Sequence, residues 1–395
     1  MRKIAANYIF TLRGKPLKNG IIVLNDDNVV TEIIDTGGRL RDGEKIEFYN
    51  GILVPGFVNC HSHLELSFMK GRIASGVGID GFIDGMVHLR KEEEGIIKKE
   101  IEKYDCIMSA NGIVAVGDIS NNSLSFECKK NSPVYYHTFC EIFHPDDKFA
   151  DDEFMRGLEL YNKAKNEFEL AASIVPHAPH TVSDKLFSLI KQHAQQTGNI
   201  LSVHNQESAS ENDYFKFGSG KLYNKLKEIR KEAFCWEKKN TSSLKYMYQK
   251  FPDTNRLILV HNTFSSLEDI ETVSAYFKNL FWCICPNSNL YIENTLPDVY
   301  LLRDNKQNIV VGTDSLASNL NLSILDELKT ISFNFENISL EEMITWACLN
   351  GAKALNIEDS HGNFYPGKKP GVVLLEKVNL QELKLTKNSK VKVIA

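Results

Sequence analysis

The stretch PGFVNCHSHLELS, at residues 55–67, contains an apolar run followed by two histidines one residue apart. Side chains in a β-strand alternate between two faces, so His61 and His63 point to one side and Ser62 to the other. Two imidazoles on one face at the end of a strand supply half of a metal site. For an isolated motif, a pair of surface histidines in a loop is the alternative, so the rest of the chain has to decide between them.

Seven more short apolar runs follow along the chain, and amphipathic segments separate them. The runs cover residues 112–118, 134–142, 170–177, 199–204, 256–261, 280–288 and 308–314. The segments between them include DKLFSLIKQHAQQ at 184–196 and LEDIETVSAYFKN at 267–279, both with helical spacing of apolar residues. Strands that alternate with helices predict an α/β fold with a parallel sheet, and eight such units predict a (β/α)8 barrel of the TIM type.

Polar side chains stand at the carboxyl ends of these predicted strands. In chain order they are His61 and His63, Asp118, Glu141, His177, His204, His261, Asn287 with Ser288, and Asp314. In a barrel of this type all of these ends meet on one face, where the active site lies. Five of the 11 histidines in the chain fall at these positions, and this concentration favours a metal site over a surface pair at His61 and His63.

Segments outside the predicted barrel have patterns of their own. Residues 1–53 and 366–395 contain short stretches with a period of two, which predict strands from both termini that pair into one small β-sandwich. The barrel domain is then expected at 54–365. Residues 208–250, after the fifth strand, are too many for a simple loop, and we expect them to be helical and to cover the site.

Composition limits the class of protein. The chain has 395 residues, an apolar fraction of 43%, a charged fraction of 25% and a net charge of −5, which are typical of a soluble globular protein and unfavourable for binding nucleic acid. No run of 18 apolar residues is present, and polar residues interrupt the opening MRKIAANYIFTLRG, so we expect no membrane span, anchor or signal peptide. Eight scattered cysteines indicate a reducing, cytoplasmic location. A homo-oligomer is compatible with the sequence.

The strand-end residues have the chemistry of a hydrolytic metal site. His61, His63, His204 and Asp314 offer three nitrogens and one oxygen, a set that suits zinc or iron. Glu207, three residues after His204, is placed to carry a proton, although acids are also common near helix starts. His261 ends the sixth predicted strand, where it is either a group that contacts the same water or a buried core histidine.

Six motifs occur in an order that resembles the amidohydrolase superfamily, in the branch with cytosine, guanine and S-adenosylhomocysteine deaminases and triazine hydrolases. They are PGFVNCHSHLELS, VPHAPHTVS, SVHNQES, LVHN, CPNSN and GTDSLASN. The closing stretches LNGAKALNI and GNFYPGKKPGVVLL resemble the same branch. The stretch HLELSFMKGRIASGVGIDGFIDGMVHLR is most similar to the aminofutalosine deaminase group.

This resemblance implies a role for individual residues. By position, His61, His63, His204 and Asp314 correspond to the ligands of one divalent metal ion, zinc or alternatively iron. Glu207 corresponds to the catalytic acid, His261 to a proton shuttle, and Asp314 to the base as well as a ligand. His177 corresponds to a substrate-contacting position, and Glu65 and Ser318 are further candidates for substrate binding, with Glu65 alternatively only terminating the strand. The implied reaction is hydrolytic deamination of an amino-substituted heterocycle, such as an adenine-type nucleoside of the aminofutalosine kind.

Some positions depart from the pattern. His180 stands where relatives often have Tyr, and Asn287 where Arg is common, and both departures concern the identity of the small-molecule substrate. No lysine ends the fourth strand, which argues for one metal rather than a carbamate-bridged pair, and the two-cysteine zinc signature of nucleobase deaminases is missing. Two alternatives stay open: a hydrolytic dehalogenase of the triazine hydrolase kind, and a barrel scaffold without activity.

Overall fold

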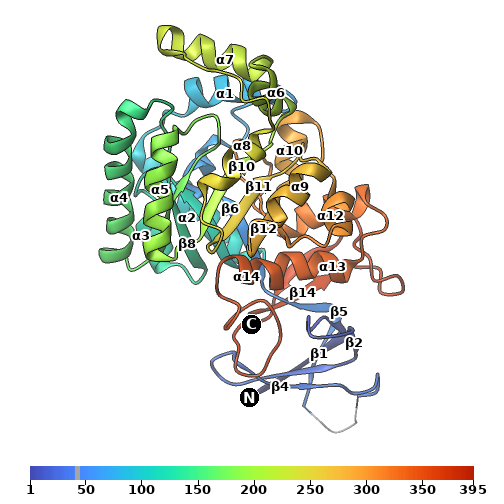
Figure 1. The fold of residues 1–395 in the computed structure, drawn as a ribbon. Coiled ribbons are helices and arrows are strands. Elements are labelled where there is room, and N and C mark those ends of the chain that lie inside the picture. Colours follow the sequence, from blue (N-terminus) through green and yellow to red (C-terminus); the bar gives the residue numbers. More distant parts are fainter. Residues whose placement is uncertain (41–44) are drawn as a thin grey trace.

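The structure is a computed structural model that describes residues 1–40 and 45–395. It has a large α/β part and a small β part that lies beneath it in the view of Figure 1. Both chain termini lie in the small part (Figure 1). No helix among the described residues is both long enough and apolar enough to span a membrane.

Eight strands of the large part follow one another in the chain and run parallel within two sheets of four. The first sheet contains β6 (Phe57–Ser62), β7 (Ile113–Ser120), β8 (Tyr135–Ile142) and β9 (Ala171–Pro176). The second contains β10 (Leu201–Asn205), β11 (Arg256–His261), β12 (Asn279–Ile284) and β13 (Ile309–Val311). All eight runs expected from the sequence are strands.

The two sheets touch through backbone contacts at both of their edges. Ser62, at the end of β6, forms a parallel bridge with Asp314, just after β13. At the other edge, the backbone N–H of His204 in β10 donates to the carbonyl oxygen of His177, just after β9, over 2.9 Å. Both contacts join strand ends, so the carboxyl ends of strands from the two sheets come together on one face.

The seventh run is shorter than its sequence predicts. Residues 280–288 were expected as one strand, but β12 ends at Ile284 and helix α10 (Pro286–Glu293) begins two residues later. Proline has no backbone N–H and fits the first turn of a helix, where that donor would have no partner. Asn287 and Ser288 therefore lie on α10 and not at a strand end.

Helices surround the parallel strands on the outside (Figure 1). The elements between and after the strands are η1 (Leu64–Met69), α2 (Glu94–Ala110), α3 (Phe126–Asn131), η2 (Asp147–Phe149), α4 (Ala150–Asn166), α5 (Asp184–Thr197), α9 (Leu267–Ser274), α11 (Val299–Asp304), α12 (Ile324–Asn334), α13 (Leu340–Ile344), η5 (Thr345–Asn350) and α14 (Gly351–Ala354). Helix α5 illustrates why they form. Ser183 caps its first turn, Gly198 ends it in the left-handed conformation, and Leu186, Ile190 and Ala194 are buried along one stripe.

The small part is a single seven-stranded sheet made from both ends of the chain. It contains β1 (Arg2–Ile9), β2 (Leu17–Lys18), β3 (Ile21–Leu24), β4 (Val30–Ile34), β5 (Glu47–Pro55), β14 (Val372–Glu376) and β15 (Lys390–Val393). Strand β5 joins the two ends, because it pairs with β1 on one side and β14 on the other. The sandwich expected from the sequence stays a prediction, and residues 41–44 of its N-terminal portion lie outside the described residues.

Three helices lie over the top of the large part in Figure 1 and are called the helical cover here. The helical cover consists of α1 (Gly78–Leu89), α6 (Ala209–Phe217) and α7 (Lys221–Arg230). After α7 the chain continues through η3 (Lys231–Ala233), α8 (Ser243–Met247) and η4 (Tyr248–Lys250), which are not counted as part of the cover. The helical character expected for residues 208–250 is confirmed. Tyr214, Phe215, Leu222 and Leu226 are buried together in an apolar cluster that belongs to this segment.

Candidate active site

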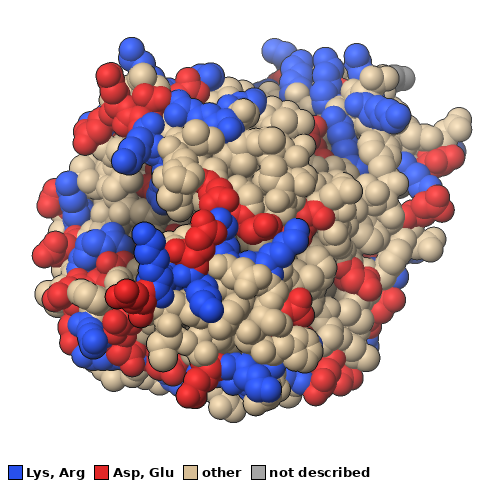
Figure 2. Space-filling model, turned by 90° about the horizontal axis from the view of Figure 1, so that it is seen from above, with Lys and Arg blue, Asp and Glu red and all other residues tan. Residues whose placement is uncertain are grey.

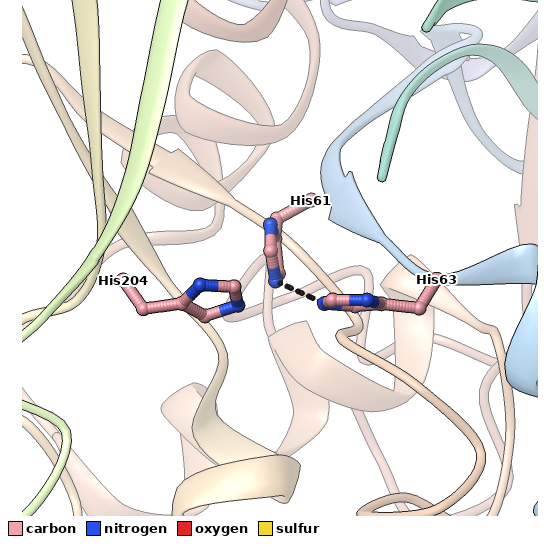
Figure 3. A group of neighbouring side chains, drawn as sticks. All are labelled: His61, His63 and His204. Atoms are coloured by element: carbon pink, nitrogen blue, oxygen red, sulfur yellow. Dashed lines mark hydrogen bonds between the residues drawn. The ribbon is translucent and has the colours of Figure 1, made fainter. Parts of the chain in front are cut away.

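Three of the predicted ligands converge at the carboxyl ends of the strands. His61 lies in β6, His63 directly follows that strand, and His204 lies in β10. Their rings face a common centre (Figure 3), with centroids 4.9 Å apart for His61 and His63, 4.9 Å for His61 and His204, and 5.5 Å for His63 and His204. The Nε2 atoms of His61 and His63 are 3.1 Å apart, so both nitrogens are aimed at the same small volume.

Asp314, just after β13, completes this group. Its Oδ1 lies 3.5 Å from Nε2 of His61 and 3.4 Å from Nε2 of His63. Its Oδ2 accepts hydrogen bonds of 2.6 Å each from the hydroxyl groups of Ser288 and Ser318. The backbone of Asp314 has a φ of +58°, an uncommon conformation that costs energy outside glycine, and its N–H donates to the carbonyl of His61 over 3.0 Å.

The protonation states fit a cation. Burial lowers the pKa of His61 to about 4 and that of His63 well below its ordinary value, so both imidazoles are neutral near pH 7. For Asp314, burial acts to raise the pKa, but the hydrogen bond with His61 and the neighbouring histidines outweigh it and hold the pKa well below the ordinary value. Two neutral imidazoles and a carboxylate around one point, with His204 beside them, are a donor set that suits zinc or iron.

Glu207 and His261 lie beside this group and close to each other. Glu207 follows β10, His261 ends β11, and Oε1 of Glu207 is 3.7 Å from Nε2 of His261. The His261 ring stacks on His204 at a centroid distance of 5.5 Å, and its backbone has a φ of +76°. Burial raises the pKa of Glu207 to about 8 and lowers that of His261 to about 3. A protonated acid and a neutral imidazole therefore stand side by side at neutral pH.

His63, His204, Glu207, His261 and Asp314 line a cavity of about 400 Å³. Its wall includes His63, His177, His180, His204, Glu207, Glu211, His261, Asp314 and Ser315, together with Arg90, Asn121, Glu141 and Phe143. The helical cover adds Ile79, Phe82, Ile83, Met86 and Val87 from α1 and Leu226 from α7. Outside the cavity, the face seen from above in Figure 2 carries basic and acidic side chains interspersed with one another. Within the cavity, the polar residues at the strand ends form the floor, and the mostly apolar residues of the helical cover form the roof.

The three predicted substrate-binding residues have different positions. His177 lines the cavity, and its Nδ1 lies 2.9 Å from the hydroxyl of Thr181. Glu65 is buried behind the wall, where Arg90 donates to it over 3.1 Å and the backbone N–H of Asn121 over 3.2 Å. Ser318 is fully buried against Asp314, while Ser315 is the serine of that loop that reaches the cavity.

Two strand-end acids and the two departures from the family pattern also have defined positions. Asp118 accepts a 2.8 Å hydrogen bond from the backbone N–H of Leu64 and pairs with the buried Lys129 at 2.7 Å, so it supports the turn after His63 from behind. Glu141 lines the cavity, which its strand-end position indicated although nothing in the sequence gave it a role. Asn287 hydrogen-bonds Glu327 outside the cavity wall, whereas His180 lies in it.

Comparison with known proteins places this geometry in context. The amidohydrolase family model matches residues 52–394. An adenosine deaminase of Helicobacter pylori is 28% identical over 323 residues, which are 79% of this chain and 76% of that protein. The crystal structure of Helicobacter pylori aminofutalosine deaminase in complex with methylthio-coformycin superimposes with a TM-score of 0.82 at 23% identity, over 99% of this chain and 97% of that one. The atrazine chlorohydrolase of Arthrobacter aurescens TC1, complexed with zinc, gives a TM-score of 0.76 at 14% identity, over 99% and 93%.

Proposed function

The chain belongs to the amidohydrolase family, and we propose that it is a metal-dependent aminohydrolase that removes the exocyclic amino group of an adenine-type nucleoside derivative. One observation carries this proposal: His61, His63 and His204 face one point with the carboxylate of Asp314 beside them, and a carboxyl group and a neutral imidazole, Glu207 and His261, stand next to this group in the wall of a cavity. The names of relatives such as the Helicobacter pylori adenosine deaminase support the same class of substrate.

The metal is one divalent ion, zinc by preference and iron as the alternative, held by His61, His63, His204 and Asp314. Nitrogen and carboxylate ligands suit both ions, and zinc accompanies the related atrazine chlorohydrolase. Such an ion, when bound, makes water a nucleophile near neutral pH. The chain supplies His61 and His63 as neutral imidazoles and Asp314 as an ionised carboxylate, because burial lowers the pKa of the two histidines and the neighbouring histidines lower that of Asp314.

Asp314 and His261 act on the attacking water. Oδ2 of Asp314 is held by Ser288 and Ser318, which leaves Oδ1 free to accept a proton on the side of the histidines. His261 is neutral, and its Nε2 faces the cavity beside Glu207, where it orients the water through a hydrogen bond. We assign Ser318 to the positioning of Asp314 and not to direct substrate contact, because its hydroxyl donates its hydrogen bond to that carboxylate.

Glu207 acts on the heterocycle. With a pKa of about 8 it carries a proton at neutral pH, and it is placed in the cavity wall to donate that proton to a ring nitrogen. Protonation makes the adjacent ring carbon electrophilic, water adds to that carbon, and the amino group leaves as ammonia. His177, which lines the same cavity, contacts the substrate.

We further propose that the two four-stranded sheets form one eight-stranded barrel, because the contacts of Ser62 with Asp314 and of His204 with His177 join both pairs of edges. The barrel domain spans 54–365, with 1–53 and 366–395 forming the small β domain.

A second candidate is the displacement of another leaving group, such as chloride, from a triazine-like ring by the same residues. The likeness of fold to the atrazine chlorohydrolase favours it as the alternative.

A substrate panel separates the two candidates. The purified protein, analysed for metal, is given adenosine, 5′-deoxyadenosine, 5′-methylthioadenosine, guanine and a chlorotriazine, and ammonia and chloride are measured. The proposal expects about one equivalent of metal and ammonia release from at least one adenine nucleoside. Chloride release from the triazine without ammonia from any nucleoside would establish the second candidate instead, and no turnover with metal bound would contradict both.

A further inference from the structure

Glu141 is a buried carboxylate with one oxygen that has no hydrogen-bond donor. It lies near the end of β8, is 2% exposed, and lines the cavity. Its Oε2 accepts a 2.9 Å hydrogen bond from the side-chain amide of Asn121. Its Oε1 is buried and accepts no hydrogen bond from any residue that the structure describes. A buried acceptor without a donor is unfavourable, so Oε1 calls for a donor from outside the chain.

The neighbouring His204 does not satisfy this oxygen. Nδ1 of His204 is 3.6 Å from Oε1 of Glu141, too far for a hydrogen bond, while the same nitrogen is 2.7 Å from the carbonyl oxygen of His177. That N–H is therefore already donated to the carbonyl. The same contact argues against a second metal ion between Glu141, His177 and His204, because Nδ1 of His204 has no lone pair left to offer.

A network behind Glu141 fixes which oxygen faces the cavity. Arg90 donates to Oδ1 of Asn121 over 2.8 Å, which sets the orientation of that amide. The amide NH2 of Asn121 is then turned to Oε2 of Glu141. Arg156 donates to the backbone carbonyl of Glu141 over 3.2 Å. The carboxylate is held in place on one side, and Oε1 is left as its free side.

His177 offers a second acceptor close by. The hydroxyl of Thr181 donates to the carbonyl of Ala178 over 3.0 Å, so it accepts from Nδ1 of His177 at 2.9 Å. The proton of His177 is then on Nδ1, and its Nε2 carries a lone pair. Glu141 and His177 each have an oxygen or ring-nitrogen atom within 4.8 Å of the other and of one on His204. Two acceptors that lie this near to each other can serve two neighbouring hydroxyl groups.

An adenine nucleoside has few donors that could fill these positions. Its ring presents nitrogens that accept, and its only ring-borne donor is the amino group that leaves in the reaction. The remaining donors are the hydroxyl groups of the sugar. We propose that Oε1 of Glu141, together with Nε2 of His177, accepts hydrogen bonds from the ribose hydroxyls, and that Glu141 thereby selects ribonucleosides over their deoxy analogues. This inference rests on the proposed function.

The test compares ribose analogues in the wild-type enzyme and in Glu141→Gln. In the variant, the amide oxygen takes the N–H of Asn121, so that an NH2 donor replaces the acceptor facing the cavity. Glu159→Gln, on the exposed face of α4, is the matched control. Each protein is assayed for kcat/KM with adenosine, 2′-deoxyadenosine, 3′-deoxyadenosine and 2′,3′-dideoxyadenosine, and for metal content. Binding of inosine and 2′,3′-dideoxyinosine by calorimetry gives a readout that does not depend on turnover.

Wild type and Glu159→Gln are expected to prefer adenosine over 2′,3′-dideoxyadenosine by at least about tenfold, as for charge-assisted hydrogen bonds in a buried site. Glu141→Gln is expected to lose most of that preference, in kcat/KM and in inosine binding, with its metal retained. An unchanged preference in Glu141→Gln, or equal use of all four nucleosides by wild type, would overturn the inference. Loss of metal from Glu141→Gln would also overturn the inference, because it would show that Glu141 supports the metal ligand His204 and does not select the ribose. Failure of wild type on every adenine nucleoside would instead remove the proposed function itself.

Discussion

The floor and the roof of the cavity are held in place by different forces. The floor consists of His63, His204 and Asp314, with His61 buried directly behind them, and all four lie on or beside strands whose backbones pair with their neighbours. The roof is the helical cover, where α7 is tied to α1 by ion pairs of Lys225 with Asp84 at 2.9 Å and Lys221 with Asp80 at 3.9 Å. Ion pairs at the surface contribute little stability, whereas the hydrogen-bonded strands of a sheet give the side chains at their ends a rigid support.

The sequence of α1 adds to this difference. Gly81 and Gly85 lie inside the helix, where glycine lowers helix stability. A Cβ at Gly85 would lie 2.7 Å from the side chain of Ile73, so the glycine allows a close approach that a larger residue would not. We infer that the residues of the rigid floor carry out the reaction, and that the residues of the more loosely held roof determine which substrate binds.

The largest effect is expected from the floor. His61→Ala removes one of three imidazoles from a fully buried site, and metal affinity should fall by more than about 100-fold, because even outer partners of metal ligands contribute about 10- to 100-fold. Activity should fall with it while the barrel stays folded. Metal analysis, ammonia release and circular dichroism measure the three quantities, with His88→Ala on the exposed end of α1 as the control. Full metal and normal turnover in His61→Ala would exclude His61 as a ligand.

The next effect is on proton transfer. Glu207→Gln keeps the size of the side chain and removes its transferable proton, so kcat should fall by about 10²- to 10⁴-fold with metal retained. Binding of an unreactive product-like nucleoside should change much less, since the loss is concentrated in the transition state. A metal-replete Glu207→Gln enzyme with a near-normal rate would move the acid to another group of the cavity wall.

The pH profile gives a smaller and graded effect. Burial raises the pKa of Glu207 to about 8, and its role requires the protonated form. The rate should therefore be retained below this pKa and decline as pH rises through it, approaching a tenfold loss per pH unit above it. In Glu207→Gln the alkaline decline should disappear from the residual activity. A decline that persists unchanged in that variant would assign it to a different group.

The smallest effect is expected from the roof. Phe82→Ala removes an aromatic ring from the cavity wall without touching the floor, so KM should rise by about tenfold or less while kcat and metal content stay unchanged. His88→Ala on the same helix, outside the wall, is the control. Hydrogen exchange should show low protection in residues 208–230 that rises with bound nucleoside. A fall in kcat of Phe82→Ala as large as its rise in KM would show that the roof takes part in chemistry.

Much of the floor could be predicted from the sequence, and the reason is geometric. Parallel strands end on one face, so His61, His63, His204 and Asp314 could be placed together from the ends of three apolar runs without knowing any contact. The matching of 52–394 to the amidohydrolase family confirms the resemblance drawn from the motifs. The helical character of the segment after β10 was equally accessible, because its length excluded a simple loop.

The rest depended on contacts between distant segments. The free oxygen of Glu141 exists because Arg90 and Asn121, 51 and 20 residues earlier, fix the opposite oxygen, and no periodicity encodes such a network. Glu65 and Ser318 lie behind the wall for a similar reason, since Glu65 accepts a hydrogen bond from Arg90 and Ser318 donates one to Asp314. The early end of β12 was readable in principle from Pro286, which favours the first turn of a helix.

The central claim is that one metal ion at the floor of the cavity drives deamination of an adenine nucleoside. Protein stripped of metal with a chelator is titrated with zinc, and in parallel with ferrous iron, while ammonia release from the best nucleoside of the panel is followed. The account predicts that activity rises from near zero and levels off at one equivalent, and that His61→Ala is not activated. Activity that is unaffected by chelation, or that keeps rising to two equivalents, would contradict it.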